Sequence, residues 1–75
     1  MARRSRSQDD LKTFASKVYT ARRSRQMTQA ELARRIGIDR SAICRIELGE
    51  KAPRFHQLIA LHDALEIPRG TLLAA

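Results

Sequence analysis

The sequence lacks most of what disulfide-linked, metal-binding and membrane proteins depend on. Its 75 residues include one cysteine, no tryptophan, three glycines and two prolines. Cys44 alone cannot form an internal disulfide, and without a paired Cys/His spacing it offers no zinc site. No apolar run approaches the roughly 20 residues of a membrane span, and no signal-peptide pattern follows Met1. These absences predict a cytoplasmic protein with no metal or cofactor, and no motif points to a small-molecule ligand.

The charged residues are biased toward one sign. Lys+Arg number 15 and Asp+Glu number 8, so the formal net charge is +7. Such an excess indicates a polyanionic partner, and double-stranded DNA is the first candidate. A membrane surface would need a basic helix with bulky apolar residues on its other face, and single-stranded RNA would need stacking aromatics. The chain has no tryptophan, one tyrosine and two phenylalanines, so it offers few of the aromatic residues that either partner favours.

The chain divides into a short arm and one folded domain. Residues 1–8 combine basic and serine residues without an apolar anchor, which predicts a disordered arm. The arginines of this arm either lie along DNA or only keep the protein soluble; they are Arg3, Arg4 and Arg6. Residues 9–75 are rich in helix formers and show no strand-length alternation, so we predict an all-α domain.

Apolar spacing and end signals predict five helices in this domain. They cover residues 9–25, 28–36 and 40–48, a fourth helix from Phe55 onward and a short last helix from Pro68. In the fourth helix, Phe55 is predicted to lie on the side that faces the core.

The second and third predicted helices are short and closely joined. Thr28 and Glu31 have the spacing of a capping box, in which each side chain bonds the other residue's backbone N–H. Gly37 ends that helix, because glycine adopts the left-handed conformation at low cost. Asp39 can cap the next helix, which Gly49 ends.

The third helix has two chemically different faces. Ile43 and Ile46 lie on the side that packs, and Glu47 adjoins it. Because Arg22 lies at the edge of the apolar stripe of the first helix, it needs a partner, and we predict that Glu47 is that partner. The opposite side carries Arg40, Ser41 and Arg45. Since a helix fits the major groove and arginine can donate two hydrogen bonds to guanine, these residues are predicted to contact bases.

These features resemble the Cro/C1-type (XRE) helix-turn-helix family. The resemblance covers about residues 11–73 and rests on Thr28-Gln29-Ala30-Glu31-Leu32-Ala33, Gly37, Ile38, Ile43, Ile46, Glu47, Gly49 and Pro53-Arg54-Phe55. It implies a compact five-helix, lambda-repressor-like DNA-binding domain that acts as a homodimer on a (pseudo)palindromic operator. It places Cys44 beside the base-contacting residues, with a redox-sensing thiol as the alternative role.

The resemblance also implies contacts with the DNA backbone. Gln29 would bind a phosphate at the start of the second helix, and Lys51 and Arg54 would do so after the third. A helix start attracts anions through its free N–H groups and its dipole, so Thr28 belongs to the same set. Arg23 is assigned to a phosphate as well, with a solvated surface charge as the alternative.

The C-terminal part has more apolar residues than a small core needs. We predict that the excess forms a homodimer interface, made of Leu61, Leu65, Ile67, Leu72 and Leu73. The alternative is a monomer whose last helix closes the core. His62 is expected to be packed or to face the dimer partner.

Two function classes are compatible with these features. The favoured one is a transcriptional regulator, either a phage Cro-like repressor or the controller of a restriction-modification system. The alternative is an antitoxin or adaptor of the same fold whose main task is to bind a protein partner. An enzyme is not expected, because no serine, histidine and acid combine at a defined spacing.

Overall fold

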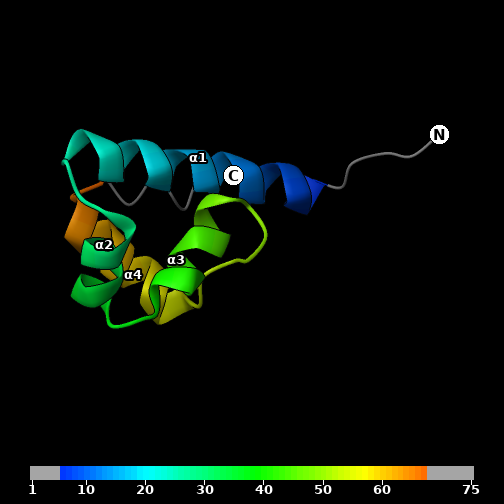
Figure 1. Ribbon diagram of the computed structural model, residues 1–75. Coiled ribbons are helices and arrows are strands. Elements are labelled where there is room, and N and C mark those ends of the chain that lie inside the picture. Colours follow the sequence, from blue (N-terminus) through cyan, green and yellow to red (C-terminus); the bar gives the residue numbers. More distant parts are fainter. Residues whose placement is uncertain (1–5, 68–75) are drawn as a thin grey trace.

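A computed structural model describes residues 6–67 of the chain, with the backbone alone given for 6–8. Four helices account for most of these residues, and no strand occurs among them (Figure 1). They are α1 (Arg6–Ser24), α2 (Gln29–Ile36), α3 (Arg40–Glu47) and α4 (Phe55–Leu65). The all-α class is therefore confirmed. The fifth predicted helix lies outside the described residues.

The first helix is longer than the sequence indicated. It begins at Arg6 and not at Asp9, so residues 6–8, which were assigned to the arm, are helical. Arginine and glutamine are good helix formers, and Asp9 in the first turn favours the positive end of the helix dipole. In Figure 1, α1 lies across the other three helices, which gather on one side of it.

The ends of α2 follow the predicted local signals. The Thr28 hydroxyl accepts a hydrogen bond from the Glu31 N–H at 3.0 Å, and the Glu31 carboxylate accepts one from the Thr28 N–H at 3.0 Å. These bonds hold the pKa of Glu31 below its usual value. At the other end, Gly37 has a φ of 76° and its N–H bonds the Ala33 carbonyl. The capping box and the glycine stop are both confirmed.

The start of α3 differs from the prediction. Asp39 has the extended backbone of a residue that precedes a helix, but its side chain makes no capping hydrogen bond. The packing of Ile43 and Ile46, both fully buried, fixes this helix in place of the cap. Gly49 follows the helix with a φ of 75°, and a Cβ there would lie 3.1 Å from the Lys12 side chain on α1.

The core lies where the four helices meet. Its most deeply buried members come from every helix and are Val18, Leu32, Ala33, Ile43, Leu61 and Leu65. Partly buried residues such as Phe14 and Ile36 pack around them. Phe55, expected on the inner side of the fourth helix, is instead 72% exposed. It is the first residue of α4, and the buried residues of that helix begin only at Leu61.

Two residues of the predicted dimer interface belong to this core. Leu61 and Leu65 are 0% and 1% exposed in the single chain, so they are not available to a second copy. The sequence interpretation was wrong here because periodicity shows that residues share a face but not what covers it. Ile67 is half-buried and packs against the core, whereas Leu72 and Leu73 lie outside the described residues.

Within residues 6–67, no helix has the length and apolar character required to cross a membrane.

Candidate nucleic-acid interface

The two faces of α3 differ as the sequence indicated. Ile43 and Ile46 are fully buried against the core. On the outer side, Arg40, Ser41 and Arg45 are exposed, and Cys44 is half-buried. The helix therefore presents two guanidinium groups and a hydroxyl to solvent. A helix fixed on one side and carrying donors on the other can enter the major groove without unfolding its core.

A buried ion pair joins α1 to the end of α3. The Nε of Arg22 donates to Glu47 Oε2 at 2.7 Å, and its Nη2 donates to Glu47 Oε1 at 3.0 Å. The two side chains are only 7% and 3% exposed. Arg22 Nη1 also donates to the Met27 carbonyl at 2.7 Å. The bonds to Glu47 raise the pKa of Arg22 above its usual value, so the guanidinium stays charged.

Glu47 has a second partner that the sequence did not reveal. Its Oε1 accepts a hydrogen bond from the Gln29 side-chain nitrogen at 3.1 Å. Gln29 was predicted to bind a phosphate, but here its amide N–H points to the carboxylate. The contact links the start of α2 to the end of α3. Because 18 residues separate the pair, helical periodicity could not signal it.

The other predicted phosphate-binding residues lie around these helices. Lys51 and Arg54 are exposed in the segment between α3 and α4, and the Arg54 N–H donates to the Gln57 side chain at 2.9 Å. Arg23 is exposed on α1, and Thr28 uses its hydroxyl in the capping box. Of the predicted arm, Arg3 and Arg4 lie outside the described residues, as does the side chain of Arg6.

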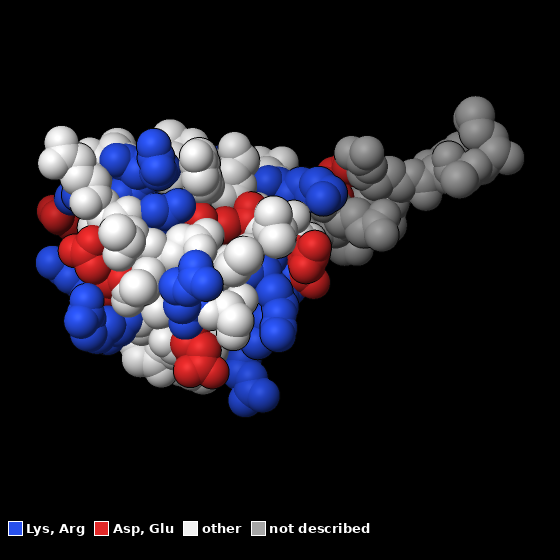
Figure 2. Space-filling view, in the orientation of Figure 1, with Lys and Arg blue, Asp and Glu red and all other residues white. Residues whose placement is uncertain are grey.

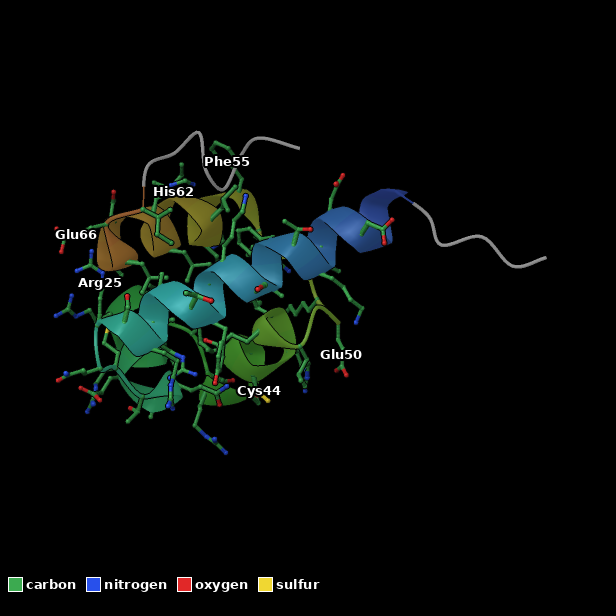
Figure 3. The ribbon with its side chains drawn as sticks, turned by 90° about the horizontal axis from the view of Figure 1, so that it is seen from above. Arg25, Cys44, Glu50, Phe55, His62 and Glu66 are labelled. Carbon is green, nitrogen blue, oxygen red and sulfur yellow. The ribbon has the colours of Figure 1, made fainter. Side chains whose placement is uncertain are left out.

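Basic side chains spread over the face of the molecule shown in Figure 2, with acidic groups among them. The view from above separates two edges of the molecule (Figure 3). Cys44 on α3 lies at one edge, and Phe55 and His62 on α4 lie at the other. The polar face of α3 is therefore remote from the exposed end of α4.

Arg25 connects α1 to the end of α4. Its Nε donates to the Leu65 carbonyl at 2.7 Å, and its Nη1 donates to the Glu66 carboxylate at 2.9 Å. Figure 3 shows Arg25 and Glu66 at the same end of the molecule. His62 on α4 is buried, with its Nδ1 3.1 Å from the Ile67 carbonyl. These contacts are structural and leave the outer face of α3 free.

The fold and this surface together define a helix-turn-helix domain. A family model described as helix-turn-helix matches residues 18–72, which is more than half of the chain. The chain belongs to this family, of the Cro/C1 type, whose members are DNA-binding transcription regulators and not enzymes.

A solved structure supports the same assignment. The crystal structure of the restriction-modification controller protein C.AhdI from Aeromonas hydrophila is 28% identical to this chain and superposes with a TM-score of 0.79. The match covers 87% of this chain and 98% of that one. No curated protein matches the chain significantly.

Proposed function

We propose that this protein is a sequence-specific regulator of transcription that binds a (pseudo)palindromic DNA operator as a homodimer. The observation that carries the proposal is the division of α3. Ile43 and Ile46 are fully buried, whereas Arg40, Ser41 and Arg45 are exposed on the outer side. In each protomer α3 enters the major groove, and these exposed residues meet base edges.

The residue types indicate which bases are recognised. Arg40 and Arg45 can each donate a bidentate pair of hydrogen bonds to O6 and N7 of guanine. Ser41 can donate or accept, and Cys44 lies beside them as a small side chain. Each bidentate pair contributes about 1–3 kcal/mol of discrimination against a wrong base. We therefore expect guanines at symmetric positions of the two half-sites.

Contacts with the DNA backbone set the register. The start of α2 at Thr28 and Gln29 is one site, and Lys51, Arg54 and Arg23 supply positive charge around it. The side-chain amide of Gln29 donates to Glu47. The free backbone N–H groups and the helix dipole at the start of α2 therefore carry more of the phosphate binding than the Gln29 side chain. If a dimer neutralises about six to ten phosphates, its affinity falls about 10³–10⁵-fold between 50 and 200 mM salt.

The dimer interface that we propose lies toward the end of the chain. With Leu61 and Leu65 in the core, the remaining candidates are Ile67, Leu72 and Leu73. Phe55 joins this set because it is a large apolar side chain left 72% exposed. A second copy of the chain that covers this ring would remove its apolar surface from water.

Among regulators of this family, a restriction-modification controller is the favoured role. The similarity to C.AhdI along nearly the whole of that chain supports it over a Cro-like repressor. An antitoxin or adaptor role has no observation in its favour. If the protein were an antitoxin, it would co-purify from its host with a stoichiometric protein partner.

Selection of bound DNA from a random pool tests the proposal directly. The wild-type protein is expected to enrich a twofold-symmetric sequence. Arg45→Ala should lose preference at one symmetric pair of positions while it keeps the rest. Uniform weakening on all sequences would make Arg45 a phosphate contact, and enrichment of no sequence would contradict the proposal.

A further inference from the structure

The single tyrosine of the chain lies on α1 next to two arginines. The centroid of the Tyr19 ring is 5.4 Å from the guanidinium carbon of Arg22 and 6.0 Å from that of Arg23, so both make cation–π contacts with it. Tyr19 is 47% exposed. Its hydroxyl has no hydrogen-bond partner within the described residues. The phenol is therefore held in place and is open to an acceptor outside the protein.

The buried Arg22 fixes the position of the Tyr19 ring. Arg22 is 5% exposed and donates to both carboxylate oxygens of Glu47 and to the Met27 carbonyl. A guanidinium with three such partners cannot move without leaving a buried charge unpaired. Tyr19 thus packs on a rigid cation. Such pre-organisation lowers the entropy that a side chain loses when it binds a ligand.

The same ion pair connects Tyr19 to the proposed phosphate site. The Glu47 carboxylate accepts hydrogen bonds from both Arg22 and Gln29. Tyr19 on α1 and Gln29 at the start of α2 therefore flank a single ion pair. Lys12, two helical turns before Tyr19, packs against Gly49 just after α3. The side of α1 that carries Lys12 and Tyr19 therefore lies beside the C-terminal end of α3.

We infer that Tyr19 is a further DNA-backbone contact, whose hydroxyl donates a hydrogen bond to a phosphate oxygen beside the guanidinium of Arg23. The inference rests on the proposed function and extends it to a residue that no motif marks. Phosphate oxygens accept hydrogen bonds from tyrosine side chains, and such contacts carry no sequence information. The phenol supplies a directed bond without charge, and Arg23 supplies the charge.

Three variants separate these contributions in binding titrations between 50 and 200 mM salt. Tyr19→Phe, which removes only the hydroxyl, should weaken binding about threefold to tenfold for each protomer, since it loses one hydrogen bond. The loss should be equal on operator and random DNA, with an unchanged salt slope. Arg23→Gln should reduce the slope by about 1 for each protomer. Arg34→Gln, which removes an exposed charge on α2, is the matched control and should leave the slope unchanged.

A direct readout uses the single tyrosine. Protein labelled with 3-fluorotyrosine carries one fluorine site, because the chain has one tyrosine. Its ¹⁹F signal should shift when operator DNA is added, and melting curves check that each variant stays folded.

The outcomes distinguish a failure of this inference from a failure of the proposed function. If Tyr19→Phe binds DNA with the affinity of the wild type, the inference is overturned, whatever the fluorine signal does. A loss on operator DNA alone also overturns it, because a phosphate contact must weaken all sequences equally. If the wild-type protein itself prefers no sequence, the proposed function fails, whereas the effect of Tyr19→Phe on random DNA still tests the phosphate contact.

Discussion

The two short helices of the helix-turn-helix have the same length but are held in different ways. Each contains eight residues, which is too few for an isolated helix to be stable in water. The start of α2 is closed by the reciprocal bonds of Thr28 and Glu31. The start of α3 has no side-chain cap, and Ile43, Ile46 and Glu47 hold it against the rest of the molecule.

This difference separates local from tertiary control. Residues close in sequence determine where α2 begins and ends, whereas the position of α3 depends on residues from α1 and the start of α2. A recognition helix fixed only from its inner side keeps its outer side free for DNA. Four predictions test this contrast, and they are given from the largest expected effect to the smallest.

The tertiary anchor of α3 is the most sensitive point. Glu47→Ala leaves the charge of Arg22 buried and unpaired, and breaking such a pair costs about 3–5 kcal/mol. Urea denaturation followed by circular dichroism measures the free energy of unfolding. Glu50→Ala, which removes an exposed carboxylate three residues on, is the control and should cost within about 0.5 kcal/mol. Equal losses in the two variants would contradict the role assigned to the pair.

The outer face of α3 should affect binding without affecting stability. Arg45 is exposed, so Arg45→Ala should leave the free energy of unfolding within about 0.5 kcal/mol of wild type. It should lose about 1–3 kcal/mol of discrimination between the operator and a variant changed at one position. Titrations of both DNAs with both proteins give this value. A strong loss of stability would show that the outer face is not independent of the core.

The two helix starts should respond differently to loss of their first polar side chain. Thr28→Ala removes a capping bond and should cost about 1 kcal/mol. Asp39→Ala removes a side chain that makes no capping bond, so its cost should be clearly smaller. Parallel urea denaturation of the two variants compares them. A larger loss at Asp39 would show that its carboxylate caps α3 in solution.

Acidification should weaken α2 through Glu31. Its pKa is lowered in the folded protein by the bonds from Thr28, so its contribution is present above the ordinary glutamate pKa and is lost as the pH falls through the folded value. Glu31→Gln should therefore reduce the acid dependence of stability by a small amount. Denaturation midpoints of both proteins at neutral and acid pH measure it. An identical pH dependence would show that the capping box does not form in solution.

Most of the fold could be predicted from the sequence, because its signals are local. The capping box, the glycine stops at Gly37 and Gly49 and the two faces of α3 each involve residues within one or two helical turns. The partnership of Arg22 and Glu47 was also accessible, since a charge at the edge of an apolar stripe requires a partner. Three features were not: the exposure of Phe55, the burial of Leu61 and Leu65, and the bond from Gln29 to Glu47.

The sequence by itself determined that the chain forms amphipathic helices, where most of them end, and that one helix carries arginines opposite isoleucines. Hydrogen bonds and periodicity over a few residues suffice for this. Only the tertiary structure decided which apolar residues α4 buries and which carboxylate oxygen serves both Arg22 and Gln29. It also placed Tyr19 against the same ion pair. These outcomes depend on how helices distant in sequence meet, and helical periodicity contains no information about the distance between two helices.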